Sequence, residues 1–410
     1  MSLSLPRPQP IGIFPLPAGL LVLPPSDDTD ALAALLRGDI GHPLPTAWRF
    51  FEAAVQGRIL EAEEMLAGDA SPVAQYNLFV LRSGSPNAFR SLRPSLPPEL
   101  SSLLEIAAFQ FGFGDELPAP ESLSGESQAF LLLARASRHL EDRDARQAIA
   151  DLEAAVECVT KVSPVFAAQL LGQVASLHRN TPGQYAARAV ESYRDAIQLA
   201  GNTPLDGFRA ELWLNLGSCY QEHSGGRRDY LTKAIHAYQE AVHCGLSETH
   251  HPEMYALAQN NLGLAYLSMP FVEANDGLRK AIAIQSFREA LKIYQPETHR
   301  LEWVSAKLNL ANALQHLPSS HPEENLLQAV EIYEELLETR SRAEDPVGYA
   351  RLLANQANAL AHLGLFSQSL EKATEAYKLF HWHNETDAAH SVLELVSTVH
   401  ENLGNKQVTS

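Results

Sequence analysis

The sequence contains little cysteine, no long apolar run and fewer basic than acidic residues. Three cysteines, at positions 158, 219 and 244, are too few and too unevenly spaced for a disulfide framework or a zinc site, so a reducing cytoplasm is the expected location. No stretch approaches about 20 uninterrupted apolar residues, so no membrane-spanning helix is expected.

The balance of charge limits the kinds of partner that the chain can have. The 31 lysines and arginines are outnumbered by 49 aspartates and glutamates, and the net charge is −18. A surface this acidic repels phosphate backbones and anionic lipids. We therefore expect neither nucleic acid nor a membrane as partner, and a basic or neutral protein fits the charge better.

Proline interrupts the first part of the chain. Nine prolines fall within residues 1–45, and proline removes a backbone donor and disfavours helix in the residue before it. This segment is expected to be extended or turn-like, with a short helix starting after Asp28 or Asp30, and its apolar stretch 11–23 is expected to pack on the body of the protein. Residues 46–125 then show helical spacing of apolar residues with frequent breaks, which is typical of degenerate helical hairpins.

Residues 126–385 repeat one pattern of paired helices. A small residue of the first helix recurs every 45–48 residues, at Gly172, Gly217, Gly263, Ala311 and Ala357. An aromatic residue of the second helix keeps nearly the same spacing, at Tyr193, Tyr238, Phe287 and Tyr333. Two independent positions with a shared period indicate a repeat array. The amphipathic segment 386–405 is expected to cap its end.

One pair of helices has a more specific pattern. The first helix fits W-x-x-L-G-x-x-Y and the second fits A-x-x-x-F/Y-x-x-A, through Trp213, Leu216, Gly217, Tyr220, Ala234, Tyr238 and Ala241. This resembles the signature of the tetratricopeptide repeat (TPR) family. The resemblance implies an all-α fold, an α-solenoid of antiparallel helix pairs wound into a right-handed superhelix. Because the period is about 12 residues longer than the usual 34, the repeats are similar to the kinesin-light-chain-like subtype.

A row of asparagines marks the candidate binding groove. Asn215, Asn261, Asn309 and Asn355 each stand two residues before the small residue. Residues one repeat apart line up in a solenoid, and the first helices of TPR pairs line the concave face. An asparagine amide both donates and accepts a hydrogen bond, so such a row can hold an extended peptide backbone. The other interpretation is that these amides tie neighbouring helices together, and both remain open.

Further residues are expected to line the same groove. They are polar amides and hydroxyls, two leucines and one cation: Asn260, Asn312, Asn358, Ser218, Gln221, Leu264, Leu267, Gln315 and Arg351. A clamp for a carboxylate terminus needs several cations, and only Arg351 qualifies. The expected ligand is therefore an extended peptide or helix, held without a carboxylate clamp.

The sequence offers little that suggests catalysis. It lacks GxxxxGK[ST], HExxH, GxSxG and GxGxxG. Cys219 and His223 have a metal-compatible i, i+4 spacing, but other repeats have alanine where Cys219 stands, so a small core residue is the preferred interpretation. We expect no catalytic site, metal or cofactor. The expected function is a protein-interaction scaffold or assembly factor; the alternative is a sensor that signals by changing the shape of its superhelix. The oligomeric state is left open.

Overall fold

The computed structural model describes residues 5–114, 117–119, 123–181, 186–270, 276–318 and 321–408. Every regular element within these ranges is a helix, which confirms the predicted all-α class. The chain forms two compact units, Met1–Cys219 and Tyr220–Ser410. The division falls within one helix of the repeat array, α11, and each unit is described by itself.

The first unit begins with short helices around the proline-rich segment. Single turns of 3₁₀ helix alternate with α-helices of 7 to 13 residues: η1 (Ala18–Leu20), α1 (Thr29–Leu36), η2 (Thr46–Trp48), α2 (Arg49–Val55), α3 (Ile59–Leu66), α4 (Pro72–Leu81), α5 (Pro86–Leu92), η3 (Arg93–Ser95) and α6 (Pro98–Gln110). Proline at the first position starts three of the α-helices, where its missing N–H has no partner to lose. α2 packs on α3, and α4 contacts α6.

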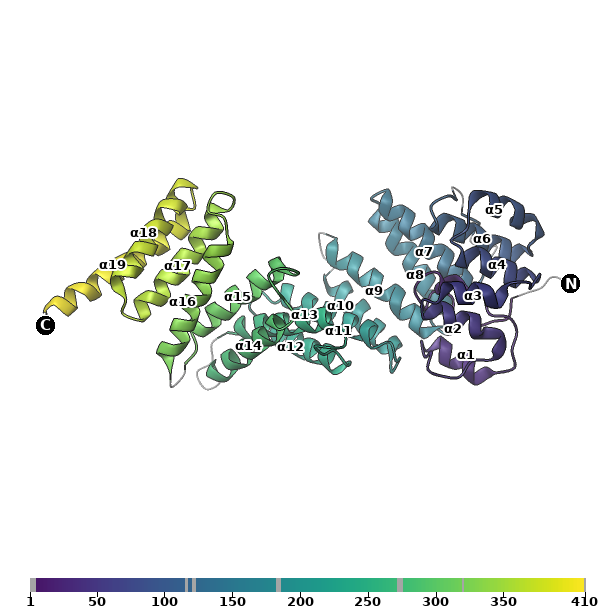
Figure 1. Cartoon of the computed structure of the whole chain (residues 1–410), viewed down its shortest axis with the longest axis horizontal. Coiled ribbons are helices and arrows are strands. Elements are labelled where there is room, and N and C mark those ends of the chain that lie inside the picture. Colours follow the sequence, from purple (N-terminus) through teal and green to yellow (C-terminus); the bar gives the residue numbers. More distant parts are fainter. Residues whose placement is uncertain are drawn as a thin grey trace. The chain divides into compact units, whose positions relative to one another are not determined.

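Longer helices follow and pack in series. They are α7 (Gly125–Glu141), α8 (Ala145–Val159), α9 (Pro164–Asn180), α10 (Ala186–Ala200) and α11 (Asp206–Glu222). α7 packs on α8, α8 on α9, and α9 on α10 (Figure 1). On α8 the buried residues Ala148, Leu152, Ala155 and Val159 recur every three or four positions, which forms one apolar stripe. α8 therefore buries one apolar stripe between α7 and α9, as an α-solenoid requires.

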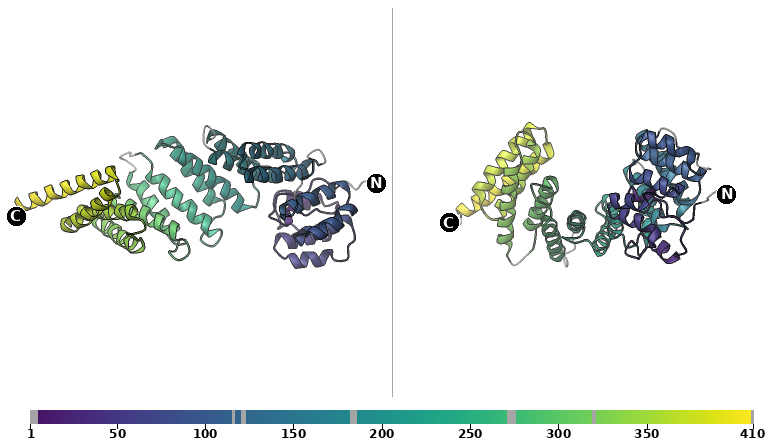
Figure 2. Two further views of the ribbon diagram at one scale, coloured as in Figure 1. Left: turned by 90° about the horizontal axis from the view of Figure 1, so that it is seen from above. Right: turned by 45° about the vertical axis from the view of Figure 1, so that its right-hand side comes forward.

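The second unit continues the same serial packing. Its helices are α12 (Arg228–His243), α13 (Pro252–Leu267), α14 (Asp276–Leu291), α15 (Arg300–Gln315), α16 (Pro322–Thr339), α17 (Pro346–His362), α18 (Phe366–Trp382) and α19 (Thr386–Val408). Each one packs on the next, and Figure 2 shows the last three side by side in two further views. The expected solenoid of helix pairs is confirmed within this unit.

The recurring small residue allows close helix packing, as the sequence predicted. A Cβ added at Gly263 of α13 would lie 2.7 Å from the ring of Phe287 on α14. In the next two pairs the equivalent Ala311 and Ala357 are fully buried. The aromatic residues Phe287 and Tyr333 are likewise buried completely, so small and aromatic positions fill the space between the helices of a pair.

The proline-rich segment lies in the core of the first unit. Its apolar side chains, including Ile11, Leu20 and Leu21, are fully buried. An extended backbone that is buried without a sheet partner needs other hydrogen-bonding groups. Asn77 of α4 supplies them, because its Oδ1 accepts from the Val22 N–H at 2.9 Å and its Nδ2 donates to the Val22 carbonyl at 2.8 Å.

A second amide and a buried carboxylate hold the segment further along. Gln9 accepts from the backbone N–H of Leu23 at 2.8 Å and donates to its carbonyl at 3.2 Å. Glu126, at the start of α7, accepts from the Gln9 N–H at 3.1 Å and from Arg7 at 2.6 Å. A buried carboxylate is tolerated when it is paired and hydrogen-bonded in this way. The segment is thus fixed to both the short helices and the repeat helices of its unit.

Candidate binding groove

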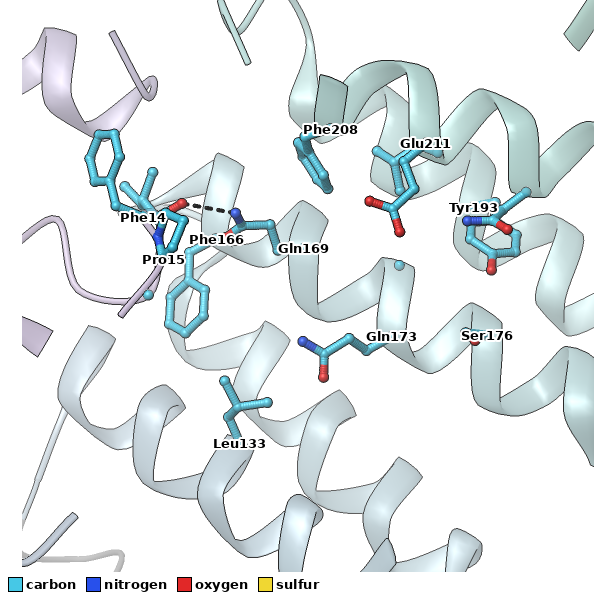
Figure 3. Close-up of a pocket in the computed structure, with 15 residues that line it drawn as sticks. Phe14, Pro15, Leu133, Phe166, Gln169, Gln173, Ser176, Tyr193, Phe208 and Glu211 are labelled. Atoms are coloured by element: carbon cyan, nitrogen blue, oxygen red, sulfur yellow. Dashed lines mark hydrogen bonds between the residues drawn. The ribbon is translucent and has the colours of Figure 1, made fainter. Parts of the chain in front are cut away.

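The main candidate site is a pocket of about 460 Å³ in the first unit. It is lined by the first helices of successive pairs, α7, α9 and α11, by one residue of α10 and by residues 12–15 of the proline-rich segment. Its size falls within the usual range for ligand sites in proteins. Figure 3 shows the side chains of α9 and α11 on facing sides of this space.

The proline-rich segment forms one wall of the pocket. Gly12, with φ at +82°, lies so close to Phe166 that an added Cβ would come within 2.3 Å of the ring. Next to it, Nε2 of Gln169 donates to the carbonyl of Ile13 at 2.9 Å (Figure 3). A side-chain amide on α9 therefore already holds the backbone of the turn formed by residues 11–13.

The same glutamine has an acceptor without a partner. Its Oε1 is buried and accepts no hydrogen bond from any residue that the structure describes. Because Nε2 must face the Ile13 carbonyl, the orientation of the amide is fixed and Oε1 remains the unused atom. A buried acceptor without a donor is costly, so this atom favours a ligand that brings a donor.

The rest of the lining is polar on one side and apolar on the other. Gln173 and Ser176 of α9 face the pocket, and Leu133 and Phe208 supply apolar surface. Glu211 is the only charged residue of the lining, and it forms no ion pair within the described ranges.

One residue of α10 closes the pocket from behind. Tyr193 is 1% exposed, and its burial raises the pKa of its hydroxyl to about 12. The group therefore stays neutral at the back of the pocket.

One of the predicted asparagines belongs to this pocket. Asn215 lines it from α11, and its Oδ1 accepts from Nη1 of Arg179 on α9 at 3.3 Å. Ser218 lies one turn further on, where its hydroxyl donates to the carbonyl of Leu214 at 3.1 Å. Asn215 thus both bridges two first helices and contributes to the site.

In the second unit, two other asparagines bridge helices. Oδ1 of Asn312 on α15 accepts from the hydroxyl of Tyr333 at 2.7 Å and from Nδ2 of Asn355 on α17 at 3.2 Å. Asn355 also lines a smaller pocket of about 320 Å³, together with the exposed Arg351. The amide of Asn312 therefore connects α15 to both α16 and α17.

The remaining predicted asparagines lack a hydrogen-bond partner among the residues that the structure describes. Asn261 and Asn309 are half-buried, and neither forms a hydrogen bond with another described residue; the same holds for Asn358. Oδ1 of Asn260 is buried and also without a partner. Leu264 packs against the apolar core of its unit. Asn261 and Asn309 are consequently the residues of the row that are available to a ligand.

The two predicted glutamines have a structural partner that sequence reasoning missed. The hydroxyl of Tyr238 donates to Oε1 of Gln221 at 2.8 Å, and that of Tyr333 reaches Oε1 of Gln315 at 3.1 Å. The pair between them has phenylalanine in place of tyrosine, and there the glutamine position is Leu267. The sequence contained this signal, because glutamine stands at this position in these two pairs, whose aromatic residue is tyrosine, and leucine stands there in the pair that has phenylalanine.

Glu211 was missed although its position could have been inferred. It stands four residues before Asn215, and Arg351 stands four residues before Asn355. The same register position was recognised in the last repeat and overlooked in the earlier one. Gln173 likewise precedes Ser218 by one period of 45 residues.

Two kinds of feature are absent from the described part of the chain. None of its helices is long and apolar enough to cross a bilayer. No group of three or more histidine, cysteine, aspartate or glutamate side chains is placed to hold a metal ion among those residues.

The helix pairs, their small and aromatic packing positions and the groove lined by first helices define a TPR-like helical-repeat protein. No family model and no curated protein matches the sequence. Among solved structures, the apo form of RapI covers 87% of this chain and 97% of its own at 12% identity and a TM-score of 0.44. A Rap protein complexed with Competence and Sporulation Factor covers 91% of this chain and 99% of its own, at 15% identity and a TM-score of 0.38. The TPR2AB-domain:pHSP90 complex of yeast Sti1 covers 67% of this chain and 100% of its own, at 16% identity and a TM-score of 0.26.

Proposed function

We propose that this protein is a non-catalytic interaction scaffold or assembly factor that binds an extended segment of another protein along its first helices. One observation carries the proposal: the amide of Gln169 on α9 already donates to a main-chain carbonyl, that of Ile13 in the turn formed by residues 11–13, so the first helices present amides that can hold a backbone. A partner segment that continues past this wall would enter a pocket lined by amides and apolar side chains.

The wider properties of the chain are consistent with a protein partner. The net charge of −18 favours a neutral or basic partner over nucleic acid or an anionic membrane. We place the protein in the cytoplasm and, from the length of its repeats, in the kinesin-light-chain-like subtype.

The test compares affinity purifications of the tagged protein and three variants from its source cells. Gln173→Ala removes an exposed amide of the pocket, and Asn261→Ala/Asn309→Ala removes the two available amides of the second unit. Gln198→Ala, an exposed glutamine on the second helix α10, is the matched control. We expect a partner that is retained by wild type and control and is lost from at least one groove variant with unchanged circular dichroism. A partner retained equally by all four proteins would refute binding through the first helices.

A further inference from the structure

We propose that the pocket between α9 and α11 binds a lysine or arginine side chain of an extended peptide, with Glu211 as its counter-charge. The proposal rests on the proposed function, because it assigns the chemistry of the segment that the groove holds. It depends on the charge of the residues that line the pocket, on one amide oxygen without a hydrogen-bond donor and on the apolar surface around these groups.

Charge is the first argument. Glu211 is the one charged side chain that lines the pocket, and Figure 3 shows its carboxylate directed from α11 into the space in front of α9. Two arginines nearby are directed elsewhere, since Arg209 lies 3.5 Å from Asp206 and Arg179 donates to Asn215. Neither arginine lines the pocket. A carboxylate without an ion pair at a partly enclosed surface favours a cation.

The second argument is the acceptor on the opposite helix. Oε1 of Gln169 is buried and receives no hydrogen bond, although the same amide is anchored to the Ile13 carbonyl. A guanidinium carries five N–H donors and an ammonium carries three, whereas an uncharged apolar side chain carries none. A cationic side chain can therefore serve both the carboxylate of α11 and the amide of α9.

The third argument is the apolar surface around these groups. Leu133, Phe208 and Leu212 line the pocket beside the polar residues. Lysine and arginine place a stem of three or four methylene groups along apolar surface while the charged end reaches polar partners. An acidic side chain would instead meet Glu211 as a like charge, and a small neutral side chain would leave the Gln169 acceptor unused.

The experiment uses the full-length protein and a positional-scanning library of acetylated, amidated hexapeptides. One position of each mixture is fixed and the others are varied, and the blocked ends exclude binding through a terminal charge. We expect mixtures with fixed arginine or lysine to give the strongest signals. A hit peptide is then resynthesised with citrulline in place of arginine, which keeps the shape and removes the charge, and Kd is measured by fluorescence anisotropy. A charge-assisted contact predicts at least about tenfold weaker binding of the citrulline peptide.

Three variants connect this preference to the pocket. Glu211→Gln should abolish the discrimination between arginine and citrulline, and Glu211→Arg should turn the preference toward glutamate. Glu191→Gln changes an exposed carboxylate of α10 and should keep the wild-type preference. Binding without a cation preference, or a preference that survives Glu211→Gln, overturns the inference but leaves the proposed function standing. Failure of every mixture to bind the wild-type protein overturns the proposed peptide groove itself.

Discussion

Replacing Tyr333 by phenylalanine removes a hydroxyl that connects α16 to α15. This hydroxyl lies 2.7 Å from Oδ1 of Asn312 and 3.1 Å from Oε1 of Gln315, and the tyrosine is fully buried. Asn312 keeps a second donor, Nδ2 of Asn355, after the change. Gln315 forms no other hydrogen bond with the residues that the structure describes, but it is half-buried, so water can reach it.

The expected cost follows from this accounting. A net hydrogen bond contributes about 1 kcal/mol, and neither acceptor is left both buried and without a donor. We expect Tyr333→Phe to destabilise the α15–α16 pair by about 1 kcal/mol. The preceding pair supplies the compensating change, because Phe287 occurs there with Leu267 in place of the glutamine. Adding Gln315→Leu should therefore recover at least about 0.5 kcal/mol, as coupled neighbours do in double-mutant cycles.

Hydrogen exchange measured by mass spectrometry is the suitable assay, since repeat arrays can unfold in parts. A loss of 1 kcal/mol corresponds to about fivefold faster exchange of the protected amides in α15 and α16. Amides of α18 serve as the internal control. If the free-energy changes of Tyr333→Phe and Gln315→Leu simply add, the hydroxyl and the glutamine do not stabilise each other. Our interpretation of Gln315 would then be wrong.

Three further predictions concern other parts of the chain. Asn77→Ala removes both hydrogen bonds to Val22, so we expect a loss of about 2–4 kcal/mol in the docking of the proline-rich segment, measured by limited proteolysis at residues 5–24. Gly263→Ala forces a Cβ toward the buried ring of Phe287 and should destabilise α13–α14 by about 1–3 kcal/mol in urea unfolding. Burial raises the pKa of the Tyr193 hydroxyl to about 12, whereas in the unfolded chain this pKa is near 10. Between about pH 10 and 12 the folded protein therefore keeps a proton that the unfolded chain has lost. The free energy of unfolding should fall as pH rises above about 10, which thermal unfolding at several pH values would measure.

Matched variants separate these effects from nonspecific damage. Gln75→Ala changes an exposed amide on the helix of Asn77 and should leave the segment protected. At Gly277 of α14 an added Cβ would meet its nearest neighbour, the carbonyl oxygen of Pro318, at 3.7 Å, which is an ordinary van der Waals contact. Gly277→Ala should therefore leave the free energy of unfolding unchanged or raise it slightly. Tyr193→Phe should make the alkaline loss of stability shallower. A wild-type slope in that variant, or equal damage from both glycine replacements, would contradict the corresponding reasoning.

The sequence was sufficient for the repeating part of the fold. Gly263 and Phe287 recur in register with the same kinds of residue in other pairs, and such periodicity reports local packing directly. The contacts of the proline-rich segment could not be predicted in this way. Asn77 and Val22 lie 55 residues apart and belong to no repeat, so nothing in the sequence relates them.

The candidate site was predicted only in part for a similar reason. The register of the repeats predicts which residues lie in one row along the solenoid. It does not predict with which neighbour each of these residues forms a hydrogen bond. Asn312 and Asn355 were both expected to line the groove, and in the structure Asn312 forms hydrogen bonds with Asn355 and Tyr333. Glu211 follows from the repeat register, whereas the wall formed by residues 12–15 depends on a long-range contact.

That long-range contact sets an order of events during synthesis. Ile13 is made 156 residues before Gln169, the side chain that holds it. Ribosomes add about 5–20 residues per second, so roughly 8–30 s pass before the binding surface exists. During that interval the stretch 11–23 can dock only on the short helices, as Val22 does on Asn77, while residues 12–15 still lack their α9 partners. Its prolines reduce the risk, because proline cannot donate to a β-ladder and so discourages aggregation of the waiting segment.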